Sequence, residues 1–318
     1  MTSVVFMGTP QFAAPILTAV IDAGYDLLAV VTQPDRRVGR KRQLAASPVK
    51  QVALEHNIKV LQPEKLSGSA AMEEIIAMQP DFIITAAYGQ FLPEKLLQSA
   101  QVAAINVHGS LLPRYRGGAP VQYAIMNGDQ QTGVTIMYMV KAMDAGDIIA
   151  QEPIPIGPND DTGTIFARMS DVGATLLLQT LPRLIKGQVT PVPQDESQVV
   201  FSPTIKPEQE QLTLDMTASQ VDWHVRALRP QPGAYFAHMN GKRTKFWRVT
   251  PLSEPTTAPS GTVTVRTKHR LVLAAAGGTQ YEVNELQPAG KPRMEITAYL
   301  NGGGQQIKEG MQVITDAD

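Results

Sequence analysis

Polar side chains with catalytic chemistry lie at the end of an apolar stretch near the middle of the chain. Asn106 and His108 are two residues apart at the end of the apolar run 102–107. Side chains of a β-strand alternate between its two faces, so this spacing predicts that both point to the same side. Asn can donate a hydrogen bond to a developing oxyanion, and His can accept or release a proton near neutral pH. The pair is therefore a candidate for acid–base chemistry at a carbonyl group.

A third polar residue, Asp144, strengthens this interpretation. By themselves, Asn106 and His108 are more typical of a hydrogen-bonded core histidine beside an asparagine in a turn. Asp144, however, follows the apolar run 134–139, and two adjacent strand ends would bring its carboxylate to the imidazole. Asp147 is an alternative for this role, but it lies where the next strand is expected to start, and its side chain is also suited to capping the turn.

The three residues lack an accompanying nucleophile. The chain has no cysteine, which excludes thiolate nucleophiles, disulfides and cysteine-ligated zinc, and we predict no metal site. Ser110 does not lie in a Gly-x-Ser-x-Gly motif, which argues against a serine hydrolase. We therefore expect direct attack of an amine on an activated acyl carbon, without a covalent enzyme intermediate. Asn106 and His108 would stabilise the tetrahedral oxyanion, while Asp144 tunes the imidazole and helps to relay the amine's proton.

The turn that follows the Asn–His pair is a candidate surface for a flat heterocycle. Leucine and proline side chains would form an apolar wall, and backbone groups would hydrogen-bond the polar edge of the ring. Residues 88–92, after the preceding predicted strand, would complete this wall. Ordinary loop packing explains both segments equally well, and the sequence alone leaves the choice open. The residues of the turn are Ser110, Leu111, Leu112 and Pro113.

Two stretches concentrate positive charge, although the net charge of the whole chain is only −1. Five of the seven residues at 36–42 are Lys or Arg, and residues 226–270 hold nine Lys or Arg with one acidic residue, Glu254. A charged loop is most often merely solvated. Two such stretches in a near-neutral chain nevertheless favour a large polyanion, bound with strong salt dependence. The cations of the first stretch are Arg36, Arg37, Arg40, Lys41 and Arg42.

Short β-rich runs alternate with helical patterns in the first half of the chain. Nearly continuous apolar strands separated by helices predict an α/β fold with a parallel sheet covered on both faces. Ligands bind at the carboxyl ends of such strands, where the Asn–His pair falls. A helix is expected over 162–186, with Pro182 kinking or ending it early and Gly187 capping it if it continues. The expected strands are 3–7, 27–31, 59–61, 82–86, 102–107 and 134–139, and the earlier helices are 12–20, 48–57 and 70–78.

The pattern changes after residue 187. Residues 188–208 are polar and interrupted by proline, which predicts a linker. Several short strands with Gly and Pro turns then predict a small barrel. We predict a catalytic domain over 1–187, the linker 188–208 and a β-barrel domain over 209–318. The elements expected beyond the linker are a helix over 218–228 and strands over 234–238, 245–249, 262–265, 271–274 and 282–286.

Composition and hydropathy favour a soluble protein. The chain has 318 residues, of which 43% are hydrophobic and 18% charged, enough for the cores of two domains. No apolar run approaches the ~20 residues needed to span a bilayer. The N-terminus lacks the basic and apolar regions of a signal peptide. We expect a cytoplasmic chain that acts as a monomer, with no membrane and no obligatory protein partner.

Several of these motifs together closely resemble the methionyl-tRNA formyltransferases, within the folate-dependent formyltransferase family. The Asn–His–Asp set is shared among folate-dependent formyltransferases, whereas the basic loop combined with the C-terminal segment points to the tRNA enzymes. The resemblance covers essentially the whole chain. The similar segments are 6–10, 33–42, 106–120, 143–147, 226–230, 232–235 and 286–291.

The resemblance implies a fold, a reaction and residue roles. The fold is a Rossmann-like formyltransferase domain followed by a barrel resembling an OB fold. The reaction transfers the formyl group of the co-substrate 10-formyltetrahydrofolate to the α-amine of methionine esterified to initiator tRNA. In this chain the family's catalytic residues correspond to Asn106, His108 and Asp144, its folate-binding loop to residues 110–113, and its tRNA acceptor-end loop to residues 36–42.

Three other functions remain open on the sequence. A formyltransferase acting on a small amine, such as a glycinamide ribonucleotide or an amino-sugar nucleotide, needs neither basic stretch. A formyltetrahydrofolate hydrolase, with water as acceptor, leaves the same cations unexplained. A non-enzymatic RNA-binding module would use the cations alone, and replacing His108 would leave its function intact.

Overall fold

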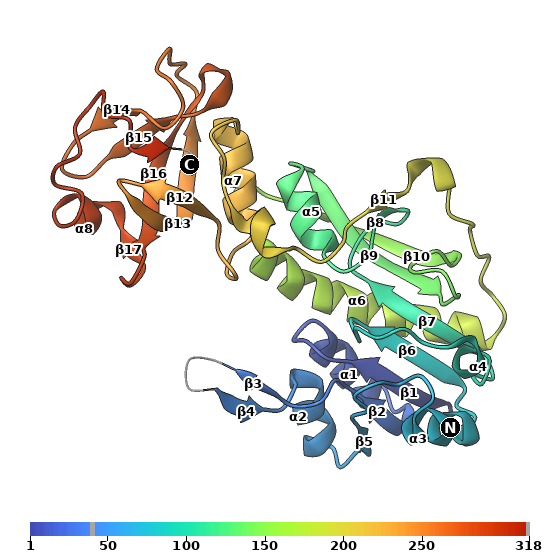
Figure 1. Ribbon diagram of the computed structural model, residues 1–318. Helices are drawn as coiled ribbons and strands as arrows, with labels where there is room; N and C mark the ends of the chain where they lie inside the picture. The colour runs from blue at the N-terminus through green and yellow to red at the C-terminus, as the bar shows by residue number, and fades with distance from the viewer. Residues whose placement is uncertain (39–41, 316–318) are drawn as a thin grey trace. The chain divides into compact units, whose positions relative to one another are not determined.

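The computed structural model describes residues 1–38 and 42–315, which form two compact units (Figure 1). Unit 1 comprises Met1–Pro120, Gln131–Pro155 and Ile165–Pro203. Unit 2 comprises Val121–Gln130, Ile156–Thr164 and Thr204–Asp318. Two short segments, at 121–130 and 156–164, therefore belong with the C-terminal part of the chain. Among the described residues, no helix has the length and apolar character required to cross a membrane.

A mostly parallel sheet of seven strands forms the centre of unit 1 (Figure 1). Its order is β10-β9-β7-β6-β1-β2-β5. The five strands from β5 to β7 are parallel, and the last two, β9 and β10, run antiparallel to their neighbours. The predicted α/β class is confirmed. The strands are β1 (Ser3–Gly8), β2 (Asp26–Val31), β5 (Val60–Leu61), β6 (Phe82–Ala86), β7 (Ala103–His108), β9 (Gln131–Tyr138) and β10 (Ile148–Pro155).

Two helices of unit 1 begin at a capping serine. Ser47 accepts a hydrogen bond from the Lys50 N–H and so starts α2, and Ser69 accepts one from the Met72 N–H and starts α3. Each serine satisfies a backbone donor that the first turn of a helix leaves unpaired. The helices of unit 1 are α1 (Ala13–Asp22), α2 (Pro48–Glu55), α3 (Ala70–Met78), α4 (Glu94–Leu97) and α6 (Thr162–Ile185), the last beginning in unit 2.

Pro182 was expected to kink helix α6 or to end it early. The helix does not end there but continues to Ile185. Gly187, at φ +63°, follows its last turn, and the Gly187 N–H donates to the Leu184 carbonyl. A glycine takes up this left-handed conformation without strain. The early end is therefore wrong, and the alternative, a helix ended by Gly187, is confirmed.

The two faces of β7 pack against different helices. Ala104 belongs to a buried cluster with Val5 and Ile83, which also includes Met72 of α3. On the other face, Val107 contacts Gly173 of α6. Residues at even positions of β7 therefore face the α3 side, and those at odd positions face α6. Asn106 and His108 lie on the same face as Ala104, as the two-residue spacing predicted.

Unit 2 contains a curled antiparallel sheet, which confirms the predicted small barrel resembling an OB fold (Figure 1). The ring of Phe246 lies between Phe236 and Tyr281, with centroids 5.2 and 6.3 Å away. The sheet order is β14-β15-β16-β13-β12-β18, and β17 pairs with β16. Its strands are β12 (Tyr235–Met239), β13 (Lys242–Leu252), β14 (Val263–Arg266), β15 (Leu271–Ala274), β16 (Gln280–Pro288), β17 (Met294–Glu295) and β18 (Ile314–Thr315).

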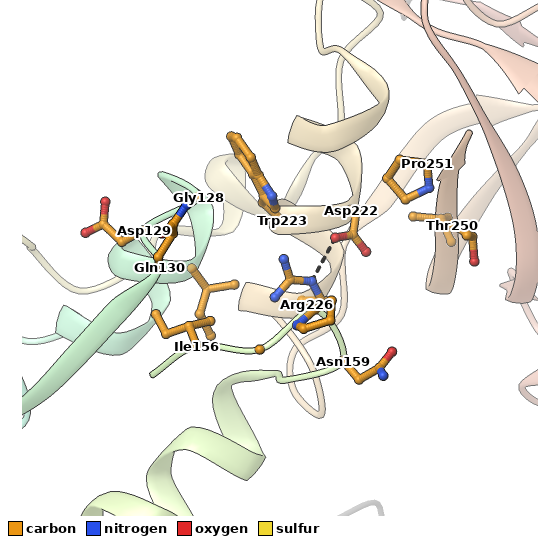
Figure 2. Close-up of a pocket in the computed structure, with 14 residues that line it drawn as sticks. Gly128, Asp129, Gln130, Ile156, Asn159, Asp222, Trp223, Arg226, Thr250 and Pro251 are labelled. Carbon is orange, nitrogen blue, oxygen red and sulfur yellow. Dashed lines mark hydrogen bonds and ion pairs between the residues drawn. The ribbon is translucent and has the colours of Figure 1, made fainter. Parts of the chain in front are cut away.

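Three helices complete unit 2: α5 (Pro120–Met126), α7 (Ala218–Ala227) and α8 (Ile296–Leu300). A cavity of about 440 Å³ opens beside α7 (Figure 2). Asp222 and Arg226 form an ion pair at its wall, with 2.8 Å between Oδ2 and Nε. Burial raises the pKa of the Asp222 carboxyl, although Arg226 acts in the opposite direction. None of the predicted catalytic residues lines this cavity.

The fold generates a stability prediction at Tyr88. This side chain is buried in the cluster beneath α3, and among the described residues its hydroxyl has no hydrogen-bond partner. Burial raises the pKa of Tyr88 to about 12. Because an unpaired buried hydroxyl costs about 1–3 kcal/mol, we expect Tyr88→Phe to stabilise unit 1. The expected rise in its apparent Tm is about 2–4 °C.

A second tyrosine provides the control. The buried Tyr299 hydroxyl is hydrogen-bonded by Asn240, so Tyr299→Phe removes a bond and should lower the apparent Tm. Both variants are measured by thermal unfolding with circular dichroism. A lower Tm for Tyr88→Phe would show that its hydroxyl is satisfied.

Candidate active site

The three predicted catalytic residues come together around one carboxylate. The Asn106 side-chain nitrogen lies 3.5 Å from Oδ1 of Asp144. Nδ1 of His108 lies 3.7 Å from the other oxygen, Oδ2. The first contact is a long hydrogen bond, and the second is an electrostatic contact rather than a hydrogen bond. The structure therefore places an amide donor, an imidazole and a carboxylate within reach of one another.

The imidazole of His108 is fixed from its other side. Only 6% of this residue is exposed, and Nε2 lies 3.0 Å from the carbonyl oxygen of Tyr115. A carbonyl can only accept, so Nε2 must carry a hydrogen. In the neutral imidazole, Nδ1 is then the unprotonated nitrogen. Proton exchange by His108 is thus directed to Nδ1, the atom that faces Asp144.

Thr85, which the sequence pattern did not single out, orients Asn106. The Thr85 hydroxyl donates to Oδ1 of Asn106 at 2.8 Å. This bond occupies the acceptor end of the amide and leaves its two N–H groups directed toward the site. The two residues are in register between β6 and β7. The sequence does show a polar residue near the end of the apolar strand 82–86. Its role becomes apparent only from the pairing of this strand with β7.

The Asp144 loop reaches the site in a way that the sequence did not predict. We expected the ends of two adjacent strands to bring Asp144 to His108. Strand β9 is instead antiparallel to β7, so Tyr138 at its end lies opposite Ile105. The loop must fold back to carry Asp144 past the strand end. The expectation of adjacent ends is wrong because apolar periodicity identifies a strand but not its direction.

Backbone geometry at two residues completes the carboxylate's environment. Asp144 has a left-handed backbone, with φ +51°, which is uncommon for residues other than glycine. The Gly117 N–H donates to Oδ2 of Asp144 at 2.9 Å. Gly117 itself has φ +124°, and a Cβ there would lie 2.7 Å from the Ser202 carbonyl oxygen. Only glycine fits this position without displacement.

Asp147, the alternative to Asp144, lies elsewhere. Its side chain is exposed, and its carbonyl oxygen accepts from the Tyr138 N–H at 3.0 Å. The pKa of the Tyr138 hydroxyl is raised by burial and also by the nearby Asp147 charge. The imidazole of His108 instead faces Asp144, which favours Asp144 for the role.

The predicted folate-binding turn is tied to the sheet by its own hydrogen bonds. The Ser110 hydroxyl donates to the Arg114 carbonyl at 2.7 Å. The Leu112 N–H donates to the Thr135 hydroxyl oxygen at 3.2 Å, and Gln151 donates to the Leu112 carbonyl at 2.9 Å. The polar groups of Ser110 and Leu112 therefore hold the turn in shape against β9 and β10.

Apolar side chains of the predicted folate-binding segments and of the Asp144 loop are exposed. Leu111 and Pro113, the other two residues of the turn, are partly exposed. Phe91 and Met143 are largely exposed, at 60% and 63%, and Met143 directly precedes Asp144. Exposed large apolar residues of this kind suit a flat aromatic ring. The segments present therefore fit a pterin-like donor.

The described residues on either side of 39–41 pair as strands, where the sequence predicted a loop. Strands β3 (Arg36–Val38) and β4 (Gln43–Ala45) pair antiparallel. Arg36 contacts Glu64 at 3.3 Å, and Arg37 donates to the Arg42 carbonyl. Three of the five predicted cations thus lie on or beside these two strands. Arg40 and Lys41 lie outside the described residues.

Many cations of the second basic stretch are paired with carboxylates that lie outside that stretch. Arg226 and Arg229 are mostly buried, against Asp222 and Asp161. The other pairs are more exposed: Arg243 with Glu210, Arg248 with Glu295 and Arg270 with Glu282. Charge counting along the chain missed these acidic partners, so the surface of unit 2 is less positive than the sequence suggested.

Comparisons with known proteins agree with this architecture. The family model described as formyl transferase matches residues 1–181, and the formyl transferase C-terminal domain matches residues 204–304. The N-formyltransferase from Helicobacter canadensis, solved with folinic acid and dTDP-3-aminofucose, has a TM-score of 0.69 at 17% identity, with 91% of this chain and 100% of that chain covered. HypX from Aquifex aeolicus, solved with tetrahydrofolic acid, has a TM-score of 0.64 at 16% identity, covering 99% of this chain and 50% of the other. The fold is that of the formyl transferases.

Sequence relatives are more specific than these structural neighbours. Methionyl-tRNA formyltransferase from Ligilactobacillus salivarius is 62% identical over 318 residues, which is 100% of both chains. The enzyme of the same name from Lactiplantibacillus plantarum is 62% identical over 316 residues, 99% of each chain. The chain belongs to the methionyl-tRNA formyltransferase family.

The site geometry predicts the effect of substituting Gly117. Gly117→Ala forces a Cβ toward the Ser202 carbonyl and displaces the N–H that binds Asp144. We expect formyl transfer to fall by roughly tenfold or more, because small misplacements of a catalytic group are costly. We also expect a loss of about 1–3 kcal/mol in the free energy of unfolding, from backbone strain and the displaced neighbour.

Gly24→Ala is the matched control. Gly24 also has a positive φ of +79°, but nothing lies within 4 Å of an added Cβ. This variant should lose stability and keep its turnover, as measured by urea unfolding and initial rates. Equal turnover of Gly117→Ala and the unchanged protein would contradict the role given to the Gly117 N–H.

Proposed function

We propose that the chain transfers the formyl group of 10-formyltetrahydrofolate to the α-amine of methionine on initiator tRNA, forming N-formylmethionyl-tRNA for translation initiation. The observation that carries this function is the 62% identity to a methionyl-tRNA formyltransferase along the whole chain. The folate donor fits the apolar segments 88–92 and 110–113. A small-amine formyltransferase or a formyltetrahydrofolate hydrolase is not favoured by relatives of this kind. An experiment that compares formyl transfer to charged initiator tRNA, charged elongator tRNA and small amines tests the assignment directly.

The roles of the three central residues follow from their contacts. Neutral His108 carries its hydrogen on Nε2, so Nδ1 accepts the proton that the attacking amine loses. Asp144 then stabilises the imidazolium across 3.7 Å. The proton passes from Nδ1 to the departing folate nitrogen as the formyl group is transferred. Asn106, oriented by Thr85, donates an N–H to the oxygen on which negative charge develops.

The remaining segments position the two substrates. Residues 110–113, with residues 88–92, bind the folate donor through apolar surface and backbone groups. The basic stretch 36–42, with Arg36, Arg37, Arg40, Lys41 and Arg42, binds phosphates near the acceptor end of the tRNA. Along the sequence, the proposed catalytic domain is residues 1–187, the linker 188–208 and the barrel domain 209–318, whereas the compact units exchange the segments 121–130, 156–164 and 188–203 across these bounds. The chain works as a monomer in the cytoplasm, without a membrane partner.

The assigned chemistry predicts the behaviour of two variants. His108→Ala removes the proton acceptor, and Asp144→Asn removes the charge that stabilises the imidazolium. Each should lower kcat by about 10² or more, because general acid–base groups contribute at this level. Binding of charged tRNA should change little, since neither residue belongs to the basic stretch 36–42. Single-turnover formylation and filter-binding assays measure the two effects.

Asp147→Asn is the control for this experiment. It neutralises an exposed carboxylate of the same loop and should leave kcat unchanged. Full turnover by either His108→Ala or Asp144→Asn would end the acid–base assignment, and loss of activity in Asp147→Asn alone would transfer the role to that residue.

The tRNA role of the basic stretch 36–42 predicts a change in salt dependence. Replacing Arg36, Arg37 and Arg42 with Gln removes cations that would displace counterions from phosphates. The affinity for charged tRNA should fall, and the slope of log K against log salt should decrease by about one for each phosphate that the variant no longer neutralises. KM for the folate donor should remain unchanged.

Lys95→Gln provides the control for charge alone, because Lys95 is an exposed cation paired with Glu73 outside the basic stretch 36–42. Its salt slope should equal that of the unchanged protein. A variant of the basic stretch that altered only folate affinity would show that this stretch has been assigned to the wrong substrate.

A further inference from the structure

The loop that carries Asp144 is held by a side chain from the segment after α6. Gln194 donates from Nε2 to the Asp144 carbonyl and to the Gly146 carbonyl, both at 2.8 Å. One amide nitrogen has two hydrogens, so these two bonds use its full donor capacity. These two bonds hold the backbone on both sides of residue 145. The catalytic loop is therefore tied to residues about fifty positions further along the chain.

A buried arginine fixes the orientation of this glutamine. Arg116 is only 4% exposed, and its Nε donates to Oε1 of Gln194 at 2.9 Å. Because the guanidinium can only donate, the amide must direct its oxygen toward Arg116 and its nitrogen toward the loop. Glu196 accepts two further bonds from Arg116, at 2.8 and 3.3 Å. Arg116 holds the pKa of the Glu196 carboxyl below its usual range.

The same arginine lies next to the second anchor of Asp144. The N–H of Gly117, the residue after Arg116, donates to the Asp144 carboxylate at 2.9 Å. The Arg116 carbonyl accepts from the Ser202 N–H at 2.7 Å, beside the pairing of β8 (Arg114–Arg116) with β11 (Val200–Phe201). Gln194 thus holds the Asp144 backbone, and the Gly117 N–H holds its carboxylate. Both groups depend on Arg116, which bonds Gln194 and directly precedes Gly117.

The conformation of Asp144 explains why such support is needed. Its loop leaves β9 opposite Ile105 and folds back to the site, and residue 144 has φ +51°. A strained backbone of this kind persists only where its surroundings over-determine it. Gly146 is also constrained, since a Cβ there would overlap the Tyr138 carbonyl oxygen. The hydrogen bonds of Gln194 to the carbonyls of Asp144 and Gly146 restrain this backbone directly.

We propose that Gln194, oriented by Arg116, is a positioning residue that sets the Asp144 carboxylate against His108. This rests on the proposed catalytic role of Asp144. The hydrogen bonds of Gln194 reach the loop backbone and Arg116, so its effect on the imidazole passes through the loop. The chemical requirement is two N–H donors at residue 194. The volume of the Gln194 side chain matters less than these donors.

Two substitutions separate donation from space filling. Gln194→Glu keeps the size of the side chain and its contact with Arg116, but it replaces the donors with an oxygen facing two carbonyls. Gln194→Ala removes donors and bulk together. We expect kcat to fall roughly tenfold in Gln194→Ala and at least as far in Gln194→Glu, with KM for both substrates unchanged. Near-normal kcat in Gln194→Glu would show that Gln194 only fills space and would overturn the proposal.

A double-mutant cycle shows whether the effect passes through Asp144. If Gln194 acts only on Asp144, Gln194→Ala added to Asp144→Asn should cause no further loss of single-turnover rate. A second, multiplicative loss in the double variant would overturn the proposal. Gln198→Ala is the matched control, because Gln198 is an exposed glutamine of the same segment that bonds Asp195 instead. Its kcat should be unchanged.

The same cycle separates failure of this inference from failure of the proposed function. Full activity in Asp144→Asn would remove the catalytic role of Asp144 itself. Reduced activity in Asp144→Asn with normal activity in Gln194→Ala would remove only the role of Gln194. Thermal unfolding of each variant checks that the fold is retained. A lower kcat with unchanged KM indicates loss of positioning, whereas changes in both indicate general damage to the site.

Discussion

The site depends on a single carboxylate that several groups share. Asp144 is mostly enclosed, with 14% of its side chain exposed, and burying a negative charge is costly unless donors or a positive partner contact it. The Gly117 N–H and the Asn106 amide supply donors, and His108 supplies a positive partner when it is protonated. Moving the carboxylate would therefore disturb the amide and the imidazole together. The position of this one group determines whether the site works as a unit.

Residues 115–117 contact both the imidazole of His108 and the carboxylate of Asp144. The Tyr115 carbonyl sets which nitrogen of His108 carries a hydrogen, and the Gly117 N–H sets the carboxylate. Both residues have positive φ, +65° and +124°, so the segment is tightly turned. Because the two contacts come from the same short stretch of backbone, the distance between imidazole and carboxylate is controlled by local geometry. Arg116, between them, connects this stretch to the segment after α6.

The sequence predicted strand positions and side-chain faces but not the directions of strands. Asn106 and His108 share a face because alternation is a property of any strand, and α3 (Ala70–Met78) has the predicted bounds. The antiparallel direction of β9 depends on the path of the chain between β7 and β9, which includes α5, and periodicity does not record that path. Thr85 was missed for a related reason, since its partnership with Asn106 arises only from the register of β6 with β7. The pairing of Arg36–Val38 with Gln43–Ala45 was not predicted because the cations of this stretch obscure any apolar alternation.

Charge also behaves differently in three dimensions than along the sequence. In unit 2, Arg226 and Arg229 are mostly buried with their carboxylates, and breaking such pairs would leave an unpaired buried charge at high cost. Arg248 and Arg270 are about half exposed, and exposed pairs contribute little stability. A phosphate can therefore replace the carboxylate at an exposed pair with little loss of stability, whereas it cannot do so at a buried one. We infer that the buried pairs maintain the fold of unit 2, while its exposed arginines remain available to a polyanion despite being paired.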